Sequence, residues 1–237
     1  VVKKDVHSFV LPPNLLDYES SYKNFGWSQA ESELKWFEEG KINAAYNAVD
    51  RHAENENKNK VALIYEAVGG RVEKYTYLDL KNASNKFANV LKKLGVAKGE
   101  RVFLFLPRIP AVYTTFLGTL KVGAIASTLF SAFGPEALLD RLGNSKAKVV
   151  VTTPELKTKI DGIKDQLPDL TYVIVVGKEE NAKEENLKRD EMPISIDYEQ
   201  EMLGASNKFE VEKTSAEDAA FLLYTSGSTG KSKGVVH

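Results

Sequence analysis

The chain has 237 residues, of which 43% are hydrophobic and 27% are charged, and its formal net charge at pH 7 is -1. This length is sufficient for a packed core. The nearly balanced charge argues against nucleic acid as the main partner, because no basic excess is available to neutralise its phosphates. The sequence contains no cysteine, which excludes disulfides and thiolate metal sites. No apolar run follows the opening V-V-K-K-D, so we expect no signal peptide and a cytoplasmic protein.

Residues 1–55 are a polar segment with scattered aromatic residues, which we interpret as an extension in front of the main domain. The apolar residues of Lys41–His52 fall at helical spacing, at Ile42, Ala45, Tyr46 and Val49. This spacing predicts a helix that docks on the main domain. The polar run E-N-E-N-K-N-K at Glu54–Lys60 marks a boundary, so we predict an extension over 1–55 and an α/β domain over 56–237.

The next predicted elements are a β-hairpin and a helix. Strands are predicted at Val61–Tyr65 and Lys74–Tyr77, with a turn at Gly69-Gly70 between them. Thr76 is followed three residues later by Asp79, which is the pattern of a helix N-cap pair. A long helix is therefore expected directly after the second strand.

From residue 101 onward, apolar strands alternate with amphipathic helices. The strands are predicted at Val102–Leu106, Ala124–Leu129, Val149–Thr152 and Tyr172–Val176. The helices between them are predicted at about 110–122, 135–142 and 155–163. This alternation is typical of an α/β fold with a mostly parallel sheet and helices on both faces.

Three further features are predicted to carry no function. Pro110–Gly134 contains a single charge, Lys121, but its glycines and the mean hydropathy of -0.30 for the chain favour a buried helix and strand over a membrane span. The Lys- and Glu-rich stretch Gly177–Pro193 is interpreted as a solvated surface excursion. No metal site is predicted, because the three histidines lack the spacing of metal ligands: His7, His52 and His237.

The last stretch of the chain reads F-L-L-Y-T-S-G-S-T-G-K-S-K-G-V-V-H. Its apolar run, Phe221–Tyr224, predicts a buried strand. The loop Thr225–Gly230 consists only of hydroxyl residues and glycines, and Lys231 and Lys233 follow it. Glycines allow successive N–H groups to converge on one anion. Ligands of parallel sheets bind at the carboxyl ends of strands, so we predict a phosphate-binding loop here.

Three other interpretations of this loop are disfavoured. A Walker A loop requires a glycine five residues before the G-K-S triplet, and Thr225 occupies that position. The G-x-S-x-G of Gly230–Gly234 matches a nucleophile elbow, but an elbow serine lies at the strand-to-helix turn and Ser232 lies well past the strand. A flexible linker would not be flanked by apolar residues on both sides.

The loop Tyr224–Gly234 resembles the signature loop of the adenylate-forming enzymes, which include the acyl-CoA synthetases. It departs from their pattern at Ser232, where the family usually has proline. The segment W-F-E-E-G-K-I-N-A-A-Y-N-A-V-D-R-H at 36–52 resembles the N-terminal segment of acetyl-CoA synthetases. Three further segments resemble the same enzymes: R-V-F-L-F-L-P-R at 101–108, F-S-A-F-G-P-E-A-L-L-D-R-L at 130–142 and V-V-V-T-T-P-E-L at 149–156.

The resemblance implies a ligase that activates acetate in two steps. Acetate and ATP form acetyl adenylate and pyrophosphate, and the thiol of CoA then displaces AMP. It assigns the ATP phosphates, bound with Mg²⁺, to eight loop residues: Thr225, Ser226, Gly227, Ser228, Thr229, Gly230, Lys231 and Lys233. It also indicates Lys157 and Lys159 as the basic candidates for the CoA phosphates.

Chains of the family continue beyond the position of His237, with the acyl pocket and a small C-terminal domain that carries the catalytic lysine. We therefore expect this chain to be the amino-terminal part of an acetyl-CoA synthetase, with no catalytic residue of its own and no activity alone. The alternative is a self-contained, non-catalytic α/β module that binds a nucleotide or phosphate. A P-loop phosphotransferase is disfavoured by the missing glycine and by the lack of a Walker B pattern.

Overall fold

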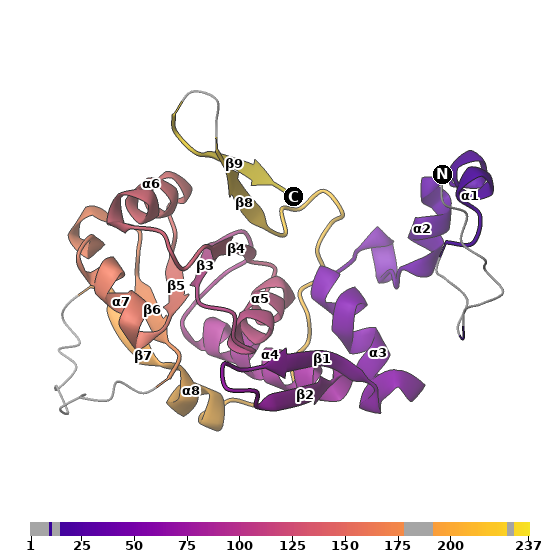
Figure 1. The fold of residues 1–237 in the computed structure, drawn as a ribbon, viewed down its shortest axis with the longest axis horizontal. Coiled ribbons are helices and arrows are strands. Elements are labelled where there is room, and N and C mark those ends of the chain that lie inside the picture. The colour runs from indigo at the N-terminus through magenta and orange to yellow at the C-terminus, as the bar shows by residue number, and fades with distance from the viewer. Residues whose placement is uncertain (1–9, 11–14, 178–191, 227–229) are drawn as a thin grey trace. The chain divides into compact units, whose positions relative to one another are not determined.

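The computed structural model describes residues 10, 15–177, 192–226 and 230–237 (Figure 1). The chain separates into two compact units, Val1–Trp36 and Phe37–His237. The first unit contains two short helices, α1 (Tyr18–Asn24) and α2 (Trp27–Glu33). This division lies at residue 36, whereas the sequence places its boundary at Glu54–Lys60; the extension over 1–55 and the domain over 56–237 stay predictions.

The second unit begins with short helical segments and a β-hairpin. The helix predicted within Lys41–His52 is present as a π-helical turn followed by an α-helical one. The segments are η2 (Glu38–Gly40), η3 (Tyr46–Asp50), α3 (Arg51–Ala53) and η4 (Glu56–Asn59). The predicted hairpin is confirmed: strands β1 (Val61–Glu66) and β2 (Val72–Thr76) pair antiparallel. Both turn glycines have positive φ, 99° at Gly69 and 83° at Gly70, which favours glycine over other residues.

A five-stranded sheet forms the centre of the second unit, with the strand order β4-β3-β5-β6-β7 and every neighbouring pair parallel (Figure 1). The strands are β3 (Arg101–Phe105), β4 (Ile125–Leu129), β5 (Val149–Thr152), β6 (Tyr172–Val175) and β7 (Ile194–Asp197). The helices are α4 (Tyr77–Lys93), α5 (Ala111–Lys121), α6 (Pro135–Ser145), α7 (Pro154–Asp161), α8 (Tyr198–Gly204) and the short η5 (Lys164–Gln166). The predicted α/β fold is confirmed.

Each face of the sheet is covered by its own hydrophobic core. Side chains of β3 alternate between the two cores: Phe103 and Phe105 pack with α6 and α7, whereas Val102 and Leu104 pack with α4. All four are at most 1% exposed. Burial on both faces explains why β3 is apolar from Val102 to Phe105 instead of alternating with polar residues.

The long helix α4 begins as predicted and packs closely on α5. Thr76 and Asp79 form a capping box, in which the Thr76 hydroxyl accepts a hydrogen bond from the Asp79 N–H at 3.1 Å. The two helices meet at Gly118 of α5, where an added Cβ atom would lie 2.8 Å from the Ser84 carbonyl oxygen and 2.8 Å from Cδ1 of Phe87. The absence of a side chain at Gly118 therefore sets the separation of the two helices.

Replacement of Gly118 by alanine is expected to lower the free energy of unfolding by about 1–3 kcal/mol, because the backbone of α4 must shift to admit the methyl group. Gly143→Ala in α6 is the matched control, since its Cβ would meet only Leu167 Cδ2 at 3.8 Å. That control is expected to be neutral or stabilising by up to about 1 kcal/mol. Denaturant unfolding measures both, and equal effects would contradict the steric argument.

The predicted strand at Phe221–Tyr224 is present, but its place in the parallel sheet was predicted wrongly. Strand β8 (Leu222–Thr225) pairs antiparallel with β9 (Lys233–Val236), and only a single parallel bridge from Phe221 to Ala126 joins it to β4. The reason is that only one face of β8 is buried: Leu222 is 8% exposed, whereas its neighbour Leu223 is 40% exposed. A strand buried on both faces would hide both residues.

The stretch Pro110–Gly134 forms α5 and β4, as predicted from its glycines. Among the residues that the structure describes, no helix has the length and apolar character required to cross a bilayer. Most of the charged stretch Gly177–Pro193, interpreted as a surface excursion, lies outside the described residues.

Candidate functional site

A cleft of about 550 Å³ lies at the carboxyl ends of β3 and β4. In the sheet, β4 lies on one side of β3, although it is the next strand along the chain, and β5 lies on the other side of β3. The order of the strands therefore reverses beside β3, and ligands of open α/β sheets bind at such a reversal. The residues that line the cleft beyond these strand ends include Leu106, Pro107, Arg108, Phe130 and Ser131. β1, α5, α6 and β8 supply the other walls.

Two arginines bring positive charge to this largely apolar cleft. The guanidinium of Arg141, on α6, lies 4.3 Å from the ring centre of Phe133 and 5.7 Å from that of Tyr224. Its Nη1 donates to the Ala137 carbonyl at 2.8 Å, while its buried Nε has no hydrogen-bond partner. Within the described part of the chain, neither Arg141 nor Arg108 forms an ion pair. Uncompensated guanidinium groups suit an anionic ligand.

The described residues of the predicted phosphate loop lie where β8 ends and β9 begins (Figure 1). Thr225 at the end of β8 lies directly opposite Lys233 at the start of β9, and both side chains are exposed. Ser226 and Lys231 are exposed as well, and Gly230 has a φ of 91°. The structure thus brings Thr225 and Lys233 together. Three of the eight predicted residues lie outside the described residues: Gly227, Ser228 and Thr229.

Tyr224 connects the hairpin to the wall of the cleft. Its hydroxyl donates to Oδ1 of Asn144 at 2.7 Å, and burial raises the pKa of this hydroxyl. Gly234 lies opposite Tyr224 in the hairpin, and an added Cβ there would lie 2.9 Å from Cδ1 of Leu222. The glycine allows β9 to lie close against the side chains of β8.

The two lysines predicted for CoA are on α7 and have partners within the chain. Lys157 forms an ion pair with Asp161 at 2.7 Å. Lys159 donates to the carbonyl oxygens of Ser131 at 3.2 Å and Phe133 at 3.0 Å, and both of these residues line the cleft. The structure thus places Lys159 against the cleft wall, and the CoA role of both lysines stays a prediction.

The sequence prediction did not single out the two cleft arginines. Arg108 could have been found, because it follows the predicted strand Val102–Leu106 at the end where ligands bind. Arg141 gave no such signal, since a charged residue in the middle of an amphipathic helix is typical of a solvated face. The described part of the chain contains no group of three or more His, Asp or Glu side chains suited to a metal ion. The absence of a metal site stays a prediction.

Fold and cleft together define an α/β protein with a cleft at the carboxyl edge of its sheet, lined by two arginines that form no ion pair among the described residues. A family model described as AMP-binding enzyme matches residues 49–237, and the chain belongs to this family. Acetyl-coenzyme A synthetase of Bacillus subtilis (strain 168) is 48% identical over 94% of this chain, which confirms the resemblance to acetyl-CoA synthetases. 3-Hydroxypropionyl-coenzyme A synthetase of Metallosphaera sedula is 36% identical over 96% of the chain.

Solved structures show the same relationship. The crystal structure of an acyl-CoA synthetase from Brucella canis matches 92% of this chain with a TM-score of 0.79 and 28% identity. The anthranilate CoA ligase AuaEII, solved with anthranoyl-AMP, matches 87% with a TM-score of 0.73 and 26% identity. The chain spans 37% of the Bacillus subtilis protein and 37% of the Brucella canis chain.

Proposed function

We propose that this chain forms the phosphate-binding part of an AMP-forming acyl-CoA synthetase. The carboxylate of the acid attacks the α-phosphate of ATP, pyrophosphate leaves, and an acyl adenylate remains. The thiol sulfur of CoA then attacks the acyl carbon, loses its proton and displaces AMP. The observation that carries the proposal is the hairpin beside the cleft, whose tip presents Thr225 opposite Lys233 with no ion-pair partner for Lys233 among the described residues.

The loop residues hold the β- and γ-phosphates in this proposal. Pyrophosphate gains negative charge as it leaves, and donors that already point toward it stabilise that charge without reorganisation. In this proposal the exposed hydroxyl of Thr225 and the exposed ammonium groups of Lys231 and Lys233 supply such donors, and the loop glycines add backbone N–H groups. The described carboxylates form no cluster for Mg²⁺, so the ion would be held mainly through the phosphates, where it neutralises charge.

Lys157 is the better of the two candidates for the CoA phosphates. Its ion pair with Asp161 is an exposed i,i+4 contact, which contributes about 0.3–0.5 kcal/mol and is easily exchanged for a phosphate. Lys159 would have to give up two carbonyl acceptors, Ser131 and Phe133. An anionic group in the cleft would instead meet Arg108 and Arg141.

Acetate is the proposed acid, on the basis of the relative from Bacillus subtilis and of the segment 36–52. The relative from Metallosphaera sedula makes 3-hydroxypropionate the second candidate, because its name records that substrate. We also propose that activity requires chain beyond these 237 residues, since a loop that contacts one end of ATP must offset an ordering cost of about 1–2 kcal/mol per residue.

Full-length protein is expected to catalyse exchange of labelled pyrophosphate into ATP that depends on acetate. Propionate and 3-hydroxypropionate, tested side by side, report the acyl specificity. The 237-residue chain alone is expected to give no exchange with any acid. Exchange that required a long-chain acid or an amino acid would refute acetate as the substrate, and exchange catalysed by the 237-residue chain alone would refute the proposal that activity requires further chain.

A further inference from the structure

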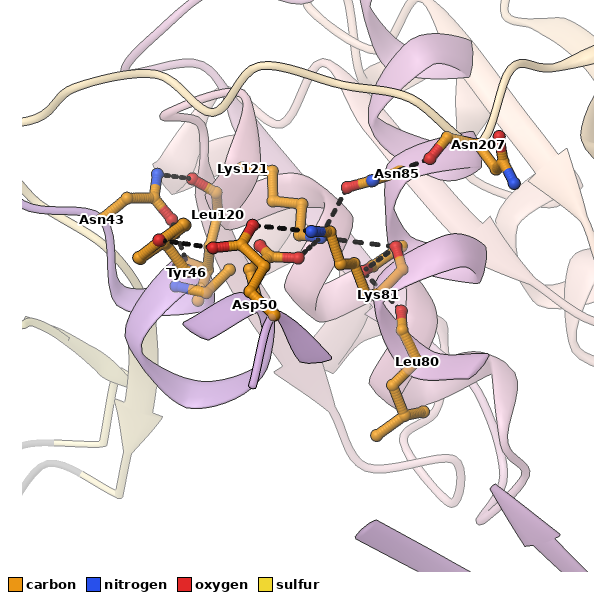
Figure 2. A network of polar contacts seen from close by, with 12 residues as sticks. Asn43, Tyr46, Asp50, Leu80, Lys81, Asn85, Leu120, Lys121 and Asn207 are labelled. Carbon is orange, nitrogen blue, oxygen red and sulfur yellow. Dashed lines mark hydrogen bonds and ion pairs between the residues drawn. The ribbon is translucent and has the colours of Figure 1, made fainter. Parts of the chain in front are cut away.

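A buried network of polar contacts surrounds Lys121, the last residue of α5 (Figure 2). Its side chain is fully buried, and its ammonium donates to Oδ1 of Asp50 at 2.8 Å and to Oδ1 of Asn85 at 2.6 Å. The carbonyl oxygen of Lys81 lies 3.5 Å away. Three acceptors thus surround the three N–H bonds of the ammonium, and Asp50 supplies the opposite charge.

The ammonium determines which way the amide of Asn85 points. An ammonium can only donate, so it must face the amide oxygen of Asn85 and not the NH₂ group. The NH₂ group is therefore turned to the opposite side, where it donates to the carbonyl oxygen of Asn207 at 2.8 Å (Figure 2). The ammonium of Lys121 in this way fixes the hydrogen bond between Asn85 and Asn207, although it does not contact Asn207 itself.

Two more asparagine side chains hold the same segment. Asn89 donates to the carbonyl oxygens of Ser206 at 2.8 Å and Lys208 at 2.9 Å. Asn43 donates to the carbonyl oxygens of Leu120 at 2.9 Å and Glu212 at 3.0 Å. Residues 206–213 form neither helix nor strand. Side-chain amides therefore satisfy backbone carbonyls that regular structure would otherwise satisfy.

The held segment leads directly into β8. Thr214 pairs with Ile42 through two backbone hydrogen bonds of 2.8 and 2.9 Å. The carbonyl oxygen of Ala220 then accepts from the N–H of Ala126 in β4 at 3.0 Å. Five residues later the chain reaches Thr225, at the base of the phosphate loop. The position of 206–214 thus fixes the path by which the chain enters the hairpin.

We propose that Lys121, Asn85, Asn89 and Asn43 form a clamp on 206–214 and act as positioning residues for the phosphate loop. The inference rests on the proposed function, since the loop must bind ATP for its position to matter. A buried ion pair contributes little to stability compared with apolar residues of similar volume. An apolar residue at position 121 would fill the same space, but it would not orient the amide of Asn85.

Asn85→Asp in the full-length protein tests the clamp. The variant keeps the shape of the side chain and its contact with Lys121, but it turns a carboxylate oxygen toward the Asn207 carbonyl in place of a donor. Amide hydrogen exchange of 206–214 is expected to accelerate about tenfold or more, while that of α5 stays unchanged. The KM for ATP in pyrophosphate exchange is expected to rise severalfold. The rate of pyrophosphate exchange at saturating ATP is expected to change less.

Asn82→Asp is the matched control, because Asn82 lies on the same helix and its side chain has no hydrogen-bond partner among the described residues. It is expected to match the unaltered protein in both measurements. Should Asn85→Asp fail to fold, Asn89→Ala removes the contacts of the Asn89 amide with the Ser206 and Lys208 carbonyls and is expected to give the same pattern.

Unchanged hydrogen exchange of 206–214 in these variants would overturn the clamp. Faster amide hydrogen exchange of 206–214 with an unaltered KM for ATP would overturn the positioning role and leave the proposed function intact. Absence of pyrophosphate exchange in the unaltered protein would refute the proposed function itself, and the positioning role with it. The three failures are therefore distinguishable.

Discussion

Lys121→Met is expected to lower the free energy of unfolding by about 3–5 kcal/mol, because it leaves a buried carboxylate without its counter-charge. The Asp50 side chain is 3% exposed, and its Oδ2 already lacks a hydrogen-bond partner. Methionine is an unbranched side chain only one heavy atom shorter than lysine, so the unpaired charge and not a cavity dominates the expected loss. Denaturant unfolding of the variant and of the unaltered protein measures the difference.

The effect of Lys121→Met is also expected to depend on pH. Burial raises the pKa of the Asp50 carboxyl, and the loss of Lys121 removes the main influence that lowers it. A carboxyl with a raised folded-state pKa destabilises the fold only where the unfolded chain is ionised. The loss of stability is therefore expected to be small below about pH 3.9 and to grow as the pH rises toward the folded-state pKa of Asp50.

The double variant Asp50→Asn/Lys121→Met is the control for the charge argument. It removes both charges, so no buried carboxylate remains unpaired, and most of the lost stability is expected to return. A double variant as unstable as Lys121→Met alone would show that the methylene packing or the contact with Asn85, and not the unpaired charge, dominates.

Lys233→Ala is expected to slow acetate-dependent pyrophosphate exchange at least tenfold in the full-length protein. Lys233 is exposed opposite Thr225 at the base of the loop. Two lost charge-assisted contacts, each contributing about 1.5–3 kcal/mol, would account for such an effect. Exchange rates across a range of ATP concentrations measure it.

Lys92→Ala provides the comparison for the lysine variant, because Lys92 is exposed on α4 and forms no ion pair among the described residues. Its exchange rate is expected to equal that of the unaltered protein. Equal rates for Lys233→Ala and Lys92→Ala would remove Lys233 from the phosphate site.

Much of the fold could be predicted because the central parallel strands β3, β5 and β6 are buried on both faces and therefore largely apolar. The elements that were missed lack this signal. β7 (Ile194–Asp197) is four residues long, half-buried and preceded by a charged stretch. β9 (Lys233–Val236) is exposed along its whole length and pairs with only one strand.

The site was predictable where residue types alone indicate the chemistry, as in the hydroxyl- and glycine-rich loop. It was not predictable where chemistry depends on contacts distant in sequence. Lys121 was visible as the single charge within Pro110–Gly134, which indicates that a buried partner must exist. Its partner Asp50 lies 71 residues away, in a helix whose apolar spacing gave no reason to choose it.

The contacts of Asn43 have a consequence for the order in which the chain acquires its structure during synthesis. Asn43 leaves the ribosome early, but its two acceptors lie 77 and 169 residues further along the chain. The sheet strands β3 to β7, in contrast, all lie within residues 101–197. The sheet can therefore assemble before the side chain of Asn43 has both of its acceptors. The hydrogen bond from Asn43 to the Glu212 carbonyl can form only after Glu212 has been translated.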